Sequence, residues 1–192
     1  MRNIFVFFLI PLLLAGNLSV QAAPAAPAVS EDGPSRLDTL FSDLKRERNE
    51  KAAERIARQI GAQWADSGSA SVDLMMQWAN DAMTEKKYDV ALDFLDQVIM
   101  LQPGFAEGWN RRATVHFMME NHAKAMADIE HTLRLEPRHF GALAGLAGIL
   151  KARGSNELAL DAYQRVLDLY PMLRDAQSEV VELADELAGE GI

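Results

Sequence analysis

Residues 106–139 read AEGWNRRATVHFMMENHAKAMADIEHTLRLEPRH, and the segments on either side, 72–105 and 140–173, repeat the same spacing. A proline stands near the end of each segment, and successive prolines lie 34 residues apart: Pro103, Pro137 and Pro171. An alanine precedes each proline by 12 residues: Ala91, Ala125 and Ala159. Large apolar residues keep the same step on both sides of each alanine. Markers that hold one period through three copies predict a repeat protein.

A period of 34 residues with two helical patterns per unit is typical of the tetratricopeptide repeat (TPR). The chain resembles that family over residues 35–188, and the third copy fits its pattern best, through Leu143, Leu146, Ala147, Leu150, Ala159, Tyr163 and Pro171. In the second copy, Arg112 and His116 replace apolar residues, which predicts a polar contact between its two helices. The resemblance implies an all-α fold, a right-handed TPR superhelix of antiparallel helix pairs.

Each conserved position of the pattern has a physical reason. Small residues allow paired helices to cross closely, and we expect this at Ala79, Ala113, Ala147, Ala91, Ala125 and Ala159. Proline ends the second helix of each copy because it donates no hydrogen bond and clashes with the preceding turn. One helix pair cannot bury its apolar stripe alone, so neighbouring copies must stack. The three copies, TPR 1 to TPR 3, are therefore assigned to 72–105, 106–139 and 140–173.

The flanking segments are predicted to close the two ends of the repeats. Residues 35–71 read as a degenerate helical hairpin in the repeat register, which begins with a capping box at Ser35 and Asp38. This hairpin lacks the proline and carries Lys45 where a small residue belongs. Residues 174–188 form an amphipathic pattern with acidic residues on its outer side, which predicts a C-terminal capping helix.

The N-terminal segment resembles an export signal. Arg2 precedes the apolar run from Ile4 to Gly16, and Val20 and Ala22 provide the small residues that a signal peptidase accepts. Residues 1–22 are therefore predicted to be a signal peptide, and the proline-rich residues 23–34 a flexible linker. An uncleaved membrane anchor is the alternative, although the run is shorter than a membrane span requires. The predicted location is periplasmic or secreted, with no membrane insertion after cleavage, as in short exported TPR proteins of Gram-negative bacteria.

Composition excludes several functions. The chain has no cysteine, which removes disulfides, thiolate metal sites and cysteine nucleophiles. With 28 acidic against 19 basic residues, its net charge of −9 argues against nucleic acid as a partner. None of the four histidines forms a metal-binding pair at helical spacing, and no phosphate loop or nucleophile elbow is present. We therefore expect no catalytic residue, cofactor site or metal site, although an enzyme with an unrecognised site stays an alternative.

The predicted function rests on the groove that TPR folds create. In the family, the first helix of each repeat lines a concave surface that holds a protein or peptide. The positions of this chain that match are Met76, Asn80, Met83, Asn110, Arg111, Thr114, Phe117, Met118 and Lys151. The carboxylate clamp of chaperone-binding TPRs is absent, because Met76, Gly141 and Gly145 stand where it needs basic residues. The helical stripe of Gly141, Gly145 and Gly148 either contacts a partner or packs within the chain.

These observations predict a non-catalytic scaffold or adaptor of the cell envelope with a protein or peptide partner. A permanent structural subunit of an envelope assembly or secretion complex is the alternative within the same broad class. Neither the partner nor an oligomeric state follows from the sequence.

Overall fold

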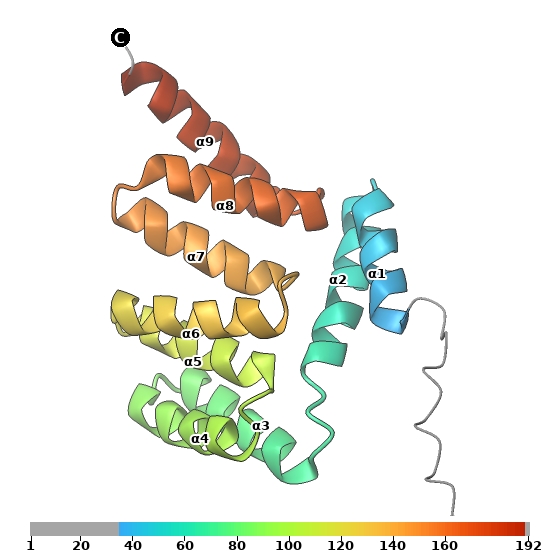
Figure 1. The fold of residues 1–192 in the computed structure, drawn as a ribbon, viewed down its shortest axis with the longest axis vertical. Coiled ribbons are helices and arrows are strands. Elements are labelled where there is room, and N and C mark those ends of the chain that lie inside the picture. Colours follow the sequence, from blue (N-terminus) through green and yellow to red (C-terminus); the bar gives the residue numbers. More distant parts are fainter. Residues whose placement is uncertain (1–34, 191–192) are drawn as a thin grey trace, which may run out of the picture. The chain divides into compact units, whose positions relative to one another are not determined.

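A computed structural model describes residues 35–190 of the chain, and the predicted signal peptide and linker lie outside this range. The described residues are helical throughout, apart from short connections (Figure 1). Nine helices are described in this range: α1 Arg36–Arg46, α2 Glu50–Trp64, α3 Ala70–Thr84, α4 Tyr88–Leu101, α5 Ala106–Met118, α6 His122–Leu135, α7 Phe140–Ala152, α8 Asn156–Leu169 and α9 Arg174–Glu190. The all-α prediction is confirmed.

Three helix pairs occupy the predicted repeats, α3–α4, α5–α6 and α7–α8, and each pair packs on the next (Figure 1). Their internal turns are equivalent, because the residues with positive φ keep the same period: Lys86, Glu120 and Gly154. Each second helix ends two residues before its proline. The residue between helix and proline is extended, with φ between −131° and −141°, as steric contact with the proline ring requires.

The predicted crossing points form the core. All six alanines assigned to these points are buried, at 3% exposure or less. Large apolar side chains fill the space around them, such as Leu95 in the first pair and Leu143 in the third. The spacing of small and large residues in the sequence therefore corresponds to the packing of one helix on another.

The central pair contains the predicted polar contact. Asp128 of α6 is buried and accepts two hydrogen bonds from Arg112 of α5, at 2.8 Å from Nε and 2.7 Å from Nη2. Asp96 of α4 accepts a third bond from the same guanidinium, at 2.7 Å from Nη1. His116 lies beside this group, and burial lowers the pKa of its imidazole below the ordinary value. One guanidinium thus links three helices.

The N-terminal hairpin differs from the expected position. Its capping box is present, with Ser35 Oγ accepting from the Asp38 amide at 3.1 Å. However, α1 and α2 do not pack on α3 as a preceding repeat would; their apolar side chains pack against Phe140, Tyr170 and neighbours at the ends of α7 and α8. Stacking on α3 would place the charged Lys45 at a helix crossing, and here Lys45 is exposed instead.

The hairpin contacts all three loops that lead from one pair to the next. The Gln102 side chain donates to the backbone carbonyl of Ser67 at 2.8 Å, after the first pair. Arg138, after the second pair, binds Asp38 at 2.6 Å, and Arg174, after the third, binds Glu50 at 2.6 Å. The hairpin therefore fixes the spacing between successive pairs.

The C-terminal helix α9 packs against α8 as predicted for a cap. Its apolar side, with Ala176 and Leu183 buried, joins the core of the third pair. Its acidic side chains Glu179 and Glu182 both bind Lys151 of α7, at 2.8 and 3.0 Å. The last helix thus covers the outer face of the third pair and part of α7.

Candidate binding groove

The first pair contributes less accessible surface to the groove than its sequence suggests. Met76 is only 6% exposed and packs in the core with Val72 and Ala79, so its assignment to the groove surface is corrected. Its position on α3 turns the thioether toward α4 because the core of this pair needs a long apolar side chain there. Asn80 and Met83 are half-buried, and Met83 packs against the same core.

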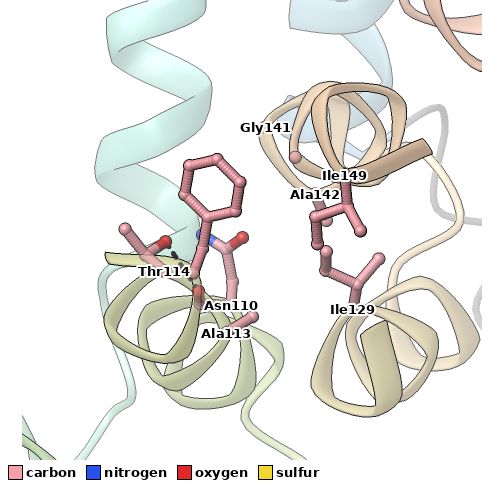
Figure 2. Close-up of a pocket in the computed structure, with 9 residues that line it drawn as sticks. Asn110, Ala113, Thr114, Ile129, Gly141, Ala142 and Ile149 are labelled. Atoms are coloured by element: carbon pink, nitrogen blue, oxygen red, sulfur yellow. Dashed lines mark hydrogen bonds between the residues drawn. The ribbon is translucent and has the colours of Figure 1, made fainter. Parts of the chain in front are cut away.

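The central and third pairs form a pocket between α5, α6 and α7 (Figure 2). Its volume is about 130 Å³. Three predicted groove residues, Asn110, Thr114 and Phe117, line its α5 side. The opposite side consists of Gly141 and Gly145, and the remaining lining is apolar: Ala113, Ile129, Ala142 and Ile149. The pocket combines an apolar floor with an amide and a hydroxyl at its edge.

The two glycines leave this space open without being required by the packing of the chain. A methyl group at Gly145 would lie 3.6 Å from Ile129 Cδ1, and one at Gly148 would lie 3.9 Å from Tyr163 Oη, which are ordinary contacts. Gly108 is different, because a methyl group there would come within 2.9 Å of Val98 Cγ1. Gly108 therefore serves the close approach of α4 and α5, whereas Gly141 and Gly145 border the pocket.

A buried carboxylate organises the first turn of α5. Glu107 is 6% exposed and accepts hydrogen bonds from Arg111 Nε at 2.7 Å and Asn110 Nδ2 at 3.1 Å. Burial raises the pKa of this carboxyl, but hydrogen bonding and charge from His139 and Arg111 outweigh it, so the pKa lies below its ordinary value. Glu107 is therefore ionised at neutral pH, and it already engages donors of two predicted groove residues.

His139 connects this carboxylate to the hairpin. Its Nδ1 accepts from the Ala142 amide at 3.1 Å and caps α7, so in the neutral imidazole Nε2 carries the hydrogen and donates to Glu107 at 3.0 Å. The Trp64 indole stacks on the His139 ring, with centroids 4.1 Å apart and planes 11° from parallel. The sequence analysis missed Trp64 and His139, because no local pattern predicts that α2 lies beside α7.

The other predicted groove residues differ in availability. Phe117 and Met118 are 43% and 49% exposed at the C-terminal end of α5, which makes them the accessible apolar groups of the groove. Lys151 is engaged by α9, whose two glutamates raise the pKa of its ammonium group above the ordinary value through hydrogen bonds and charge. The accessible groove residues thus concentrate on α5.

Metal and membrane sites were also considered over residues 35–190. This range contains no cluster of three or more histidine, aspartate or glutamate side chains placed to hold a metal ion. None of its helices is both long enough and apolar enough to cross a bilayer.

The chain is similar to known TPR proteins in sequence. It is 50% identical over 188 residues to a TPR repeat-containing protein of Rhizobium etli, covering 93% of this chain and 92% of that protein. The chain therefore belongs to the family of TPR repeat-containing proteins. It is also 32% identical to the small glutamine-rich tetratricopeptide repeat-containing protein 2 of Saccharomyces cerevisiae, over 61% of this chain and 34% of that protein. No family model matches the chain.

Solved TPR domains share the fold. The first TPR domain of Spaghetti (RPAP3), bound to an HSP90 peptide, superposes with a TM-score of 0.58 at 24% identity, over 61% of this chain and 93% of that domain. The TPR domain of Sgt2 from Aspergillus fumigatus gives a TM-score of 0.59 at 18% identity, over 64% of this chain and 83% of that one. These likenesses concern the arrangement of helices.

Proposed function

We propose that this protein is a non-catalytic scaffold or adaptor that holds a protein or peptide partner in the groove of its first helices. The observation that carries the proposal is the pocket between α5 and α7. TPR domains of similar fold have been solved with bound peptides of HSP90 and Hsp70, which supports a peptide as the ligand class. No basic clamp for a peptide C-terminus is available here, because Met76 is buried and two other positions are glycines.

The pocket fits one apolar side chain of an extended segment. An apolar cavity of about 150 Å³ accommodates a group the size of benzene, so about 130 Å³ suits an aliphatic side chain. Phe117 lies at the pocket with much of its ring exposed and can cover such a side chain. The Asn110 side-chain carbonyl has no donor among the described residues, since only its amide nitrogen binds Glu107, and it can accept from a peptide amide.

Filling the pocket from within tests this proposal. Gly145→Leu should abolish capture of the partner because its side chain would occupy the pocket. It should not lower the melting temperature, since leucine forms helix better than glycine by roughly 1 kcal/mol. Phe117→Ala should also weaken capture, by around 1–3 kcal/mol as for exposed residues that become buried in an interface.

The measurement is affinity capture from an envelope extract with mass spectrometry of the eluted proteins. Asp161→Ala, on the exposed side of α8, is the matched control and should leave capture unchanged. Proteins retained by wild type and by the Gly145→Leu variant alike would contradict binding in this pocket. Arg111→Ala is a poorer test, because it also removes the ion pair of the buried Glu107.

We further propose that the chain is exported and acts in the periplasm, like short exported TPR proteins of Gram-negative bacteria. The apolar run from Ile4 to Gly16 and the small residues Val20 and Ala22 support this address. We expect N-terminal sequencing of the protein from its native host to begin at Ala23 or one residue later. A soluble form that retains Met1 to Ala22 would contradict export.

A further inference from the structure

The first helix pair exposes an apolar face that the other pairs bury. On α3, Leu74 and Trp78 are 43% and 44% exposed, one helical turn apart. On the neighbouring helix α4, Val90 and Leu101 are also exposed, and Phe94 tilts against Trp78 with ring centroids 5.4 Å apart. A pocket of about 340 Å³ lies between the two helices at Trp78 and Val90. This surface, Leu74, Trp78, Val90, Phe94 and Leu101, is called the α3–α4 face below.

The repeat period shows what belongs on this face. The residues 34 and 68 positions after Leu74 are Gly108 and Ala142, both buried, and those after Asp81 are Val115 and Ile149, both fully buried. In the second pair the covering element is α4, and in the third it is α6. The surface equivalent to the α3–α4 face thus receives one helix in each later repeat, packed along its length.

Within residues 35–190 that place is left open in the first pair. The hairpin that should fill it by sequence register packs against α7 and α8 instead. The helical stripe of the face is intact, with Leu74, Trp78 and Asp81 on one side of α3. The face therefore retains the shape of a helix-binding surface.

Charge decides which helix fits. Four exposed carboxylates surround the apolar residues: Asp81, Glu85, Asp89 and Asp93. Two lysines lie in the turn between the helices, and one of them, Lys87, is paired with Glu85. Like charge opposes the docking of a second copy of this face on itself. We propose that the α3–α4 face binds an amphipathic helix of a partner protein, with apolar residues toward Trp78 and basic residues toward Asp81 and its neighbours.

A designed peptide tests the proposal without knowledge of the natural partner. The probe is a fluorescent helical peptide of about 18 residues with leucine on one face and lysine on the other. We expect it to bind the wild-type protein, as measured by fluorescence anisotropy. Trp78→Ala and Asp81→Lys should each weaken the affinity about tenfold, the range typical of central interface residues. Both side chains are exposed, so the melting temperature should stay nearly constant.

Matched controls separate this surface from general charge attraction and from the groove. Asp161→Lys changes the net charge by the same amount as Asp81→Lys on the exposed side of α8 and should leave the affinity unchanged. Gly145→Leu, which fills the groove pocket, should also bind the peptide normally, so failure of the groove proposal and failure of this one are distinguishable. Equal binding of a peptide with glutamate in place of lysine would overturn the proposal.

Two other occupants would also overturn it. A synthetic peptide of residues 1–34 that displaces the probe in a Trp78-dependent manner would assign the face to the chain's own N-terminal segment. Concentration-dependent dimerisation in sedimentation, abolished by Trp78→Ala, would assign it to a second copy.

Discussion

Replacing Asp128 with alanine is expected to lower the free energy of unfolding by about 3 kcal/mol. Asp128 is buried and accepts two hydrogen bonds from Arg112, so its removal leaves a partly buried guanidinium without its main partner. Urea unfolding measures the effect. Asp96→Ala is the control: its side chain is 56% exposed, and the loss of its bond to the same guanidinium should cost less than about 1 kcal/mol.

A double variant tests whether the ion pair or only its completeness matters. The third repeat carries Leu146 and Ala162 at the positions equivalent to Arg112 and Asp128. Arg112→Leu together with Asp128→Ala should therefore recover most of the stability lost in Asp128→Ala, because no charge stays buried without a partner. If the double variant were less stable than the single one, the guanidinium would contribute packing that leucine cannot replace.

Replacing Trp64 with alanine is expected to lower the free energy of unfolding by roughly 2–4 kcal/mol, as for large aromatic side chains in cores. Its indole stacks on His139 and packs beside Phe41 and Phe140, with ring centroids 5.8 and 5.0 Å away. The stacked His139 also holds Glu107 and caps α7, so the loss should extend into the groove. Thermal unfolding of the purified domain measures it.

Trp78→Ala is the matched control for Trp64→Ala, since it removes the same side chain from the open α3–α4 face. Trp78 is 44% exposed and should cost much less. Equal losses of stability in the two variants would mean that the hairpin does not pack along the loops between the helix pairs.

The repeat period predicted most of the fold because each of its markers acts locally. Pro103, Pro137 and Pro171 end helices through their own ring geometry, and alanines such as Ala125 permit close crossing wherever two helices are paired. The polar contact in the central pair was likewise predictable from Arg112, since its position in the repeat fixes which helix it faces.

The groove was predicted only in part. Asn110, Thr114 and Phe117 lie at the pocket because their repeat positions place them on the same side of α5. Met76 occupies an equivalent stripe of α3 but is buried, and Lys151 binds α9. Availability depends on which other elements cover a position, and the repeat pattern carries no information about that.

The sequence by itself thus determined the helices, their pairing and the positions of Pro103, Ala125 and their equivalents, because these follow from interactions within one repeat length. Only the tertiary structure decided where the hairpin packs. Its register, with Phe41 and Ala57 in step with the repeats, predicted stacking on α3, but Lys45 disfavours that crossing. The aromatic contacts of Trp64 with residues more than 70 positions away stabilise the alternative, and such long-range contacts leave no periodic trace in the chain.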